Sequence, residues 1–165
     1  LSKNKNIRHT VSAVENLNNS LQDIPVKLII VGEKGSQKDI KFYEKHPLVE
    51  YKGRIDNLND LKDLYASANV FCMPSIHETF GLVYIESLSQ GTPVIYTKGQ
   101  AIDGLIDDTR IALSVSGNDV NETCKAIKSL SLYPEPSLCI ETAKRYFQLS
   151  NVVDKHFKIY NGILT

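Results

Sequence analysis

The residues with the clearest chemical potential lie where a predicted buried strand gives way to a helix. Glu78 and Glu86 are two carboxylates eight residues apart, and Thr79, Phe80 and Gly81 lie between them. The free N–H groups and the dipole at a helix start attract anions, and a glycine there lets a phosphate approach the backbone closely. The two oxygens of a carboxylate are natural acceptors for the vicinal hydroxyls of a sugar. The segment therefore predicts a site for a ligand that carries both phosphate and sugar hydroxyls.

Glu86 lies within a predicted helix whose neighbouring residues are mostly apolar. A carboxylate on a mostly buried helix is costly unless it has partners, so we expect Glu86 to have a binding role. At about 3.6 residues per turn, Glu78 and Glu86 are separated by a little over two turns. We expect both to face the same way, at the start and the middle of one helix. The alternative is that Glu86 lies on an exposed stripe and that Glu78 only complements the helix dipole.

These residues need a scaffold, and the sequence predicts an alternation of helices and strands. Apolar residues spaced by three or four predict helices, and continuous apolar runs predict buried strands. The predicted helices span residues 7–21, 37–45, 58–68, 79–90, 120–130, 139–147 and 150–164, and the predicted strands span residues 26–31, 48–51, 69–73, 93–96 and 111–115. This order predicts an α/β fold with a Rossmann-like parallel sheet and helices on both faces. Ligands of such sheets bind beyond the carboxyl ends of the strands.

The first predicted helix has no strand before it, whereas a doubly wound domain normally begins with one. Two explanations are open: the first strand is missing from this sequence, or the domain is only part of a larger chain. The 165 residues show no composition break, so residues 1–165 are predicted to form one domain.

Composition excludes several classes of function. The chain has 19 Lys and Arg against 19 Asp and Glu, a formal net charge of +0, which disfavours nucleic-acid binding. The four histidines have no ligand-like spacing, so we expect no metal site. The three cysteines form no CxxC motif and are odd in number, which favours free thiols and a reducing cytosol. No apolar run approaches the roughly 20 residues that span a bilayer.

The region from Pro74 to Val94 closely resembles the Glu-x7-Glu region of group 1 (family 4) retaining glycosyltransferases, which have the GT-B fold. The matching positions are Pro74-Ser75, Glu78, Phe80-Gly81-Leu82, Glu86 and Gly91-Thr92-Pro93-Val94, with further similarity at Lys5-Asn6-Ile7, Val26 to Gly32 and Leu61 to Asn69. The resemblance spans nearly the whole chain and corresponds to the C-terminal, nucleotide-binding half of that fold.

The resemblance implies a role for each matching position. Glu86 would bind the ribose hydroxyls, Glu78 would contact the donor sugar near the reacting carbon, and Lys5 would pair with the diphosphate and stabilise the leaving group. Glu78 and Lys5 would thus be the catalytic residues. The other implied contacts are the backbone at Thr79, Phe80, Gly81 and Leu82 for sugar hydroxyls and diphosphate, and Arg54 and Ile55 for the base. The sequence departs from the family at Gly99-Gln100-Ala101-Ile102-Asp103-Gly104, where a Gly-Gly-x-x-Glu loop is common.

The predicted function is therefore donor binding in a retaining glycosyltransferase that moves a sugar from a nucleotide-diphosphate sugar, with UDP as the expected nucleotide, to an acceptor hydroxyl. The implied partners are the nucleotide-sugar donor and an N-terminal acceptor domain that this sequence lacks, and the domain alone is expected to be inactive. No cofactor or metal is expected, because Lys5 and the helix N-terminus can stabilise the departing charge. We expect a cytoplasmic location, with any peripheral contact at the inner face of the membrane made by the missing half.

Other functions remain open from the sequence. One alternative is another GT-B enzyme, such as a nucleotide-sugar epimerase; a phosphorylase is disfavoured because no pyridoxal-phosphate lysine segment is apparent. A second alternative is a non-catalytic nucleotide-binding module. A signalling receiver domain is disfavoured, because the ends of the strands at Val31 and Met73 lack the aspartates that it needs.

Overall fold

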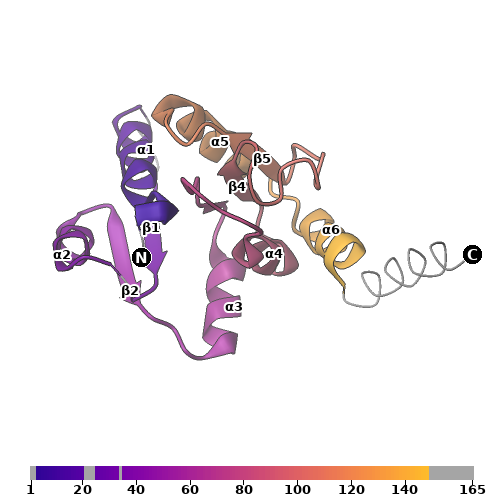
Figure 1. The fold of residues 1–165 in the computed structure, drawn as a ribbon, viewed down its shortest axis with the longest axis horizontal. Helices are drawn as coiled ribbons and strands as arrows, with labels where there is room; N and C mark the ends of the chain where they lie inside the picture. The colour runs from indigo at the N-terminus through magenta and orange to yellow at the C-terminus, as the bar shows by residue number, and fades with distance from the viewer. Residues whose placement is uncertain (1–2, 21–24, 34, 149–165) are drawn as a thin grey trace, which may run out of the picture.

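Helices and strands alternate along the part of the chain that the computed structural model describes, residues 3–20, 25–33 and 35–148 (Figure 1). The elements are η1 (Lys3–Lys5), α1 (Ile7–Ser20), β1 (Leu28–Val31), α2 (Gln37–Lys45), β2 (Val49–Gly53), α3 (Leu58–Ser67), β3 (Phe71–Cys72), α4 (Leu82–Ser89), β4 (Val94–Thr97), β5 (Ala112–Val115), α5 (Val120–Leu132) and α6 (Pro136–Phe147). The α/β class predicted from the sequence is confirmed. The predicted helix at 150–164 and the predicted helix end at Leu21 lie outside the described residues.

The described strands form two parallel sheets, whereas the sequence predicted one. β1 pairs with β2, and β3, β4 and β5 pair in that order. A strand carries hydrogen-bonding groups along both edges, so β1 and β3 each keep one edge that no described strand pairs. The structure therefore differs from the predicted single sheet because no described strand pairs β1 with β3.

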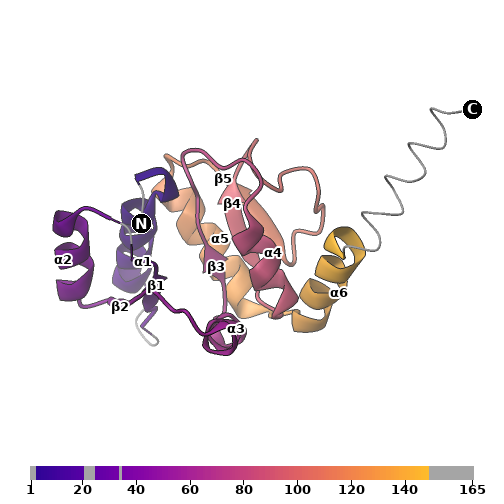
Figure 2. The same cartoon turned by 60° about the horizontal axis from the view of Figure 1, so that its bottom comes forward.

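Helices cover both faces of the larger sheet, as predicted, because successive side chains of a strand point to opposite faces. All four residues of β4 are buried. Val94 and Tyr96 pack with Tyr84 and Leu88 of α4 in one cluster, which also includes residues of α6. Ile95 belongs to the cluster on the opposite face, where α1 and α5 pack (Figure 2).

Helix α1 joins the two sheets. Val11 packs with Ile30 of β1 and Tyr43 of α2, on the side of the smaller sheet. Ala13 and Leu17, from the same helix, pack in the core of the larger sheet. The three- and four-residue spacing of apolar side chains in α1 therefore gives the helix a stripe wide enough to reach both sheets.

Helix α4 begins at Leu82, three residues later than the sequence predicted. Gly81 is its N-cap and has a left-handed backbone, with φ 73° and ψ 59°. This conformation, which favours glycine, is non-helical and stops the helix from extending towards Thr79. Thr79 and Phe80 therefore lie in the loop before α4 and not in its first turn.

Candidate functional site

An ion pair between Lys5 and Glu78 forms the centre of the candidate site. Lys5 ends η1, and Glu78 lies in the loop between β3 and α4, at the carboxyl end of the larger sheet. The Lys5 Nζ atom is 2.6 Å from Glu78 Oε2, and the two side chains are 35% and 12% exposed. The pair therefore brings together the two residues to which the resemblance assigned catalysis, although they are far apart in sequence.

Backbone and side-chain hydrogen bonds hold η1 against the loop that carries Glu78. The Ile76 N–H donates to the Asn4 carbonyl over 2.7 Å. The Asn6 side-chain amide donates to the carbonyl of Pro74 over 3.1 Å and to that of Gly117 over 2.8 Å. Asn6 itself has a φ of 52°, a left-handed conformation that asparagine tolerates better than most residues. These bonds fix the position of Lys5 next to Glu78.

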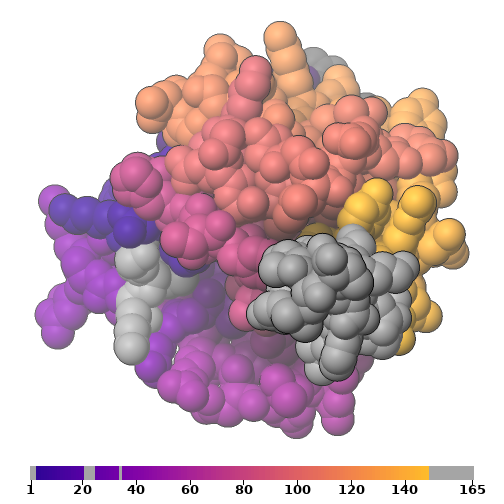
Figure 3. Space-filling view, turned by 45° about the vertical axis from the view of Figure 1, so that its right-hand side comes forward, coloured from indigo at the N-terminus to yellow at the C-terminus, as the bar shows by residue number. Residues whose placement is uncertain are grey.

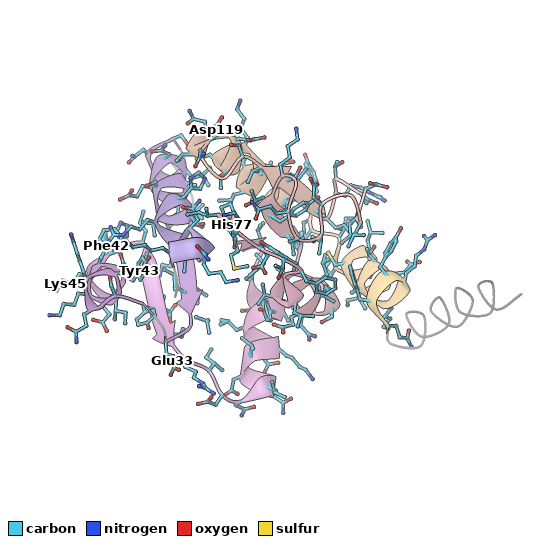
Figure 4. The ribbon with its side chains drawn as sticks, viewed as in Figure 1. Glu33, Phe42, Tyr43, Lys45, His77 and Asp119 are labelled. Carbon is cyan, nitrogen blue, oxygen red and sulfur yellow. The ribbon has the colours of Figure 1, made fainter. Side chains whose placement is uncertain are left out.

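A cavity of about 460 Å³ lies beside Glu78, at the ends of β3 and β4. Its lining comes from the loop before α4 and from the loop after β4. The lining residues are His77, Glu78, Thr79, Gly99, Gln100, Ala101 and Asp103. His77, labelled in Figure 4, is exposed and lies near the η1 end of this region. In Figure 3 the salmon segment that includes the loop after β4 forms the centre of the visible surface.

The polar character of this lining suits a ligand rich in hydroxyl groups. It contains two carboxylates, Glu78 and Asp103, an amide side chain, an imidazole and a hydroxyl. Glu78 is already paired with Lys5, and Asp103 Oδ2 accepts from the Gly99 N–H. Carboxylates and amides that line a cavity can recognise the hydroxyls of a sugar by accepting and donating hydrogen bonds.

The N-terminus of α4 provides the backbone for an anion next to this cavity. The Tyr84 N–H donates to the Gly81 carbonyl, while Phe80 and Leu82 are 46% and 63% exposed. A Cβ atom at Gly81 would collide with the ring of Tyr84 and lie 3.3 Å from Cγ of Glu78. Glycine is therefore required here both by its φ and by the space available. The dipole of α4 at this end favours a negatively charged group.

Glu86 lies on the exposed face of α4, not on a mostly buried helix as we expected. The apolar side chains of this helix divide between a buried face with Tyr84 and Leu88 and an exposed face with Leu82. The hydroxyl of Tyr65, from α3, donates to Glu86 Oε2 over 3.2 Å. Burial, followed by the nearby Glu86 carboxylate, raises the pKa of Tyr65, so its hydroxyl remains a donor at neutral pH. Glu86 thus has one orienting partner and an accessible carboxylate.

Arg54 and Ile55 follow β2, in the smaller sheet, and neither lines the described cavity. Arg54 is exposed and pairs with Asp56, at 2.5 Å, and with Glu33, at 3.4 Å. These two acids, Asp56 first, raise the pKa of the Arg54 guanidinium. The structure therefore gives Arg54 acidic partners of its own and does not bring it to Glu78. Glu86, Phe80, Gly81 and Leu82 also lie outside the set of residues that line the cavity.

Asn6 and Gln100 shape the site but were not predicted from the sequence to do so. Asn6 belongs to the family motif at Lys5-Asn6-Ile7, and Gln100 belongs to the loop in which the sequence departs from the family. Their bonds join residues between 22 and 111 positions apart. The one local signal was an Asn next to the lysine at a predicted helix start, which is typical of a left-handed or capping position.

The described residues contain neither a metal-binding cluster nor a membrane-spanning helix. Within residues 3–20, 25–33 and 35–148, no three His, Cys, Asp or Glu side chains are grouped so that they could hold a metal ion. Over the same residues, no helix combines the length and the apolar character needed to cross a membrane.

Comparison with known proteins identifies the class of protein that has this fold. The sequence profile described as "Glycosyl transferases group 1" matches residues 1–146. A solved structure described as Anabaena Alr3699/HepE in complex with UDP and glucose superimposes with a TM-score of 0.76 at 18% identity, over 98% of this chain and 46% of that one. The fold is therefore the one found in GT-B glycosyltransferases.

The chain belongs to the group 1 glycosyltransferase family. It is 30% identical over 135 residues to the D-inositol 3-phosphate glycosyltransferase of Arthrobacter sp. (strain FB24), an alignment that covers 77% of this chain and 31% of that protein. It is also 30% identical over 117 residues to an uncharacterized 41.2 kDa protein in the cps region of Klebsiella pneumoniae, covering 69% and 32% of the two chains. The chain thus spans about a third of the length of these curated relatives.

Proposed function

We propose that this chain binds the donor, a nucleotide-diphosphate sugar, for a glycosyltransferase that transfers the sugar with retention of configuration to an acceptor hydroxyl. The observation that carries the proposal is the Lys5–Glu78 pair, 2.6 Å apart, beside a polar cavity and the N-terminus of α4. A cation, a carboxylate and free backbone amides are thereby offered to one ligand that has a diphosphate and a glycosyl group.

In the proposed reaction, the bond from the anomeric carbon to the diphosphate oxygen breaks and a bond from that carbon to the acceptor oxygen forms. The nucleoside diphosphate leaves with the electron pair, and the acceptor hydroxyl gives its proton to the departing diphosphate oxygen. Lys5 and the amides at the start of α4 stabilise the negative charge that grows on the diphosphate. Glu78 contacts the sugar near the reacting carbon, and Thr79 and Phe80 contribute backbone groups.

Glu86 is proposed to bind the ribose of the nucleotide, and Arg54 and Ile55 to flank the base. The support for Glu86 is its exposed carboxylate, oriented by Tyr65 on the face of α4 away from the core. UDP is the proposed nucleotide because the similar HepE structure is described as a complex with UDP and glucose. A carboxylate that accepts from two neighbouring hydroxyls uses both of its oxygens, which gives a ribose preference over a deoxyribose.

We propose that this chain acts as the donor-binding half of a larger two-domain protein. Two features support this: the curated relatives are more than twice as long, and β1 and β3 each have an edge that no described strand pairs. A strand inserted between them would join the two sheets into one, and an added half would supply the acceptor site. We place the protein in the cytoplasm because its three cysteines are free thiols.

The experiment that tests this function is donor turnover by the full-length protein that the gene encodes. Purified protein is incubated with UDP-sugars and candidate acceptors, and UDP release is followed together with the anomeric configuration of the product by NMR. We expect UDP release, an α-linked product from an α-linked donor, and a loss of 100-fold or more in kcat for Glu78→Gln. Glu50→Gln, which changes an exposed carboxylate on β2, is the matched control and should retain wild-type kcat. Inverted product, or equal activity in Glu78→Gln and the control, would contradict the proposal.

A further inference from the structure

Gln100 holds the Glu78 loop by both ends of its side-chain amide. Its Oε1 atom accepts from the backbone N–H of Glu78 over 2.8 Å, and its Nε2 atom donates to the backbone carbonyl of Ile76 over 2.8 Å. A third bond comes from the next residue, because the Ala101 N–H donates to the Glu78 carbonyl over 3.3 Å. The peptide groups on both sides of Glu78 are therefore tied to the loop that follows β4.

The loop that supplies Gln100 is itself held in one shape. The Gly99 N–H donates to the Asp103 carboxylate, and the Asp103 N–H donates to the Gln100 carbonyl. The Gln100 N–H donates to the Thr97 carbonyl at the end of β4. Ala101 has a φ of 52°, a conformation that costs a non-glycine residue energy and persists only where its surroundings impose it. The amide of Gln100 is thus presented from a closed turn anchored on a fully buried strand.

On the side that faces the Gln100 loop, few other contacts hold the loop that carries Glu78. Ile76, His77 and Thr79 are exposed, whereas the Glu78 side chain is 12% exposed. On the opposite side, the η1 segment binds the loop through the Asn4 carbonyl. Glu78 therefore lies between two anchors, and the one from Gln100 contacts its own peptide group.

We propose that Gln100 is a positioning residue, which sets the place of the Glu78 carboxylate beside Lys5 and the cavity. This inference rests on the proposed function, because it assigns to Gln100 an effect on the sugar-transfer step through Glu78. A side-chain amide can make both bonds at once because it offers a donor and an acceptor about 2 Å apart. A carboxylate offers acceptors only, and an aliphatic side chain offers neither. Gln100 stands where the common family motif has its second glycine. A glycine has no side chain and could not make either of these bonds.

The test compares Gln100→Leu, Gln100→Glu and wild type in the full-length protein. Gln100→Leu removes both bonds, whereas Gln100→Glu keeps an acceptor for the Glu78 N–H and places an oxygen against the Ile76 carbonyl. Gln90→Glu is the matched control, because the Gln90 side chain bonds only the adjacent Ser89 hydroxyl among the described contacts. Two readouts are used: kcat and donor KM for sugar transfer, and hydrogen exchange of the peptide that contains residues 76–80.

We expect Gln100→Leu to lower kcat at least tenfold while the donor KM stays within twofold, because the proposed ribose contact at Glu86 and the proposed base contacts at Arg54 and Ile55 lie outside the Glu78 loop. Gln100→Glu should lie between Gln100→Leu and wild type. Hydrogen exchange over residues 76–80 should accelerate most in Gln100→Leu and be unchanged in Gln90→Glu. A variant that only loosened the fold would instead lower the unfolding midpoint and raise exchange across β4 as well.

Exchange separates this inference from the proposed function. If the wild-type protein transfers no sugar but Gln100→Leu still accelerates exchange at 76–80, the proposed function fails while the hydrogen bonds of Gln100 stand. If exchange at 76–80 is the same in Gln100→Leu and wild type, or if kcat is unchanged in an active enzyme, the positioning role is wrong.

Discussion

Replacement of Gly81 by alanine tests the geometry at the start of α4. Gly81 has a φ of 73°, and an alanine in this left-handed region costs about 1–2 kcal/mol. A stiffer unfolded chain offsets about 0.4–1 kcal/mol of that cost. The added Cβ would also collide with the buried ring of Tyr84, and forcing a methyl into a packed site costs a further ~1–3 kcal/mol. We therefore expect Gly81→Ala to lower the free energy of unfolding by about 2–4 kcal/mol.

Gly104→Ala isolates the conformational part of this effect. Gly104 has a φ of 75°, but a Cβ there would meet no atom within 4 Å. We expect its cost to be about 1 kcal/mol or less, from the backbone alone. The assay is urea unfolding of the purified variants, followed by circular dichroism. Equal destabilisation by the two substitutions would refute the close packing of Gly81 against Tyr84.

Three further predictions follow from the site and the core. Lys5→Met should weaken UDP-sugar turnover at least tenfold, while Lys3→Met, which changes the first lysine of η1, should leave it within twofold; similar losses in both would argue against a specific role for Lys5. Asn6→Ala should lower the free energy of unfolding by about 2–4 kcal/mol, from two lost hydrogen bonds and an unfavourable φ, whereas Asn6→Gly should cost less because it keeps the backbone; the reverse order in urea unfolding would contradict this. Burial raises the pKa of the Cys139 thiol to about 12 from 9.0, so its contribution to stability should be complete below pH 9 and be lost as the pH rises towards 12. At pH 8 a thiol reagent should therefore modify Cys124, which is half-buried, before Cys139, and mass spectrometry that finds Cys139 modified first would contradict this.

The regular elements were the most predictable part of this fold, because their signals are local. The run Val94-Ile95-Tyr96 indicated a strand buried on both faces, and β4 is entirely buried. Asn57 directly precedes the predicted helix at 58–68, at a position where asparagine is a favoured N-cap, and its side chain accepts from the Asn59 N–H in α3. These features depend on residue type and spacing within a few positions.

The start of α4 and the exposure of Glu86 were not predictable in the same way. Glycine adopts both helical and left-handed conformations, so its type alone does not predict that Gly81 is left-handed and marks the start of the helix. The apolar residues of α4 suggested a mostly buried helix, yet Leu82 is exposed. Single-helix patterns do not reveal which apolar side chains the rest of the chain covers.

The candidate site was predicted in part. The family resemblance named both Lys5 and Glu78, and the structure places them 2.6 Å apart. Asn6 and Gln100, which hold the two segments, make bonds across long stretches of sequence that no local pattern encodes. Arg54 was carried over from the loop after a predicted strand, but that strand lies in the smaller sheet, and the Arg54 side chain bonds two acids there.

Calorimetric titration of UDP into the full-length protein tests the central claim most directly. The account predicts saturable binding that Glu86→Gln weakens by about tenfold or more, since hydrogen bonds to a charged group contribute about 1.5–3 kcal/mol. Glu50→Gln, a change of the same kind on an exposed residue of β2, should bind UDP as the wild type does. Absence of UDP binding by the folded wild-type protein, or equal affinity in Glu86→Gln and wild type, would contradict the claim that this chain binds a nucleotide through the exposed face of α4.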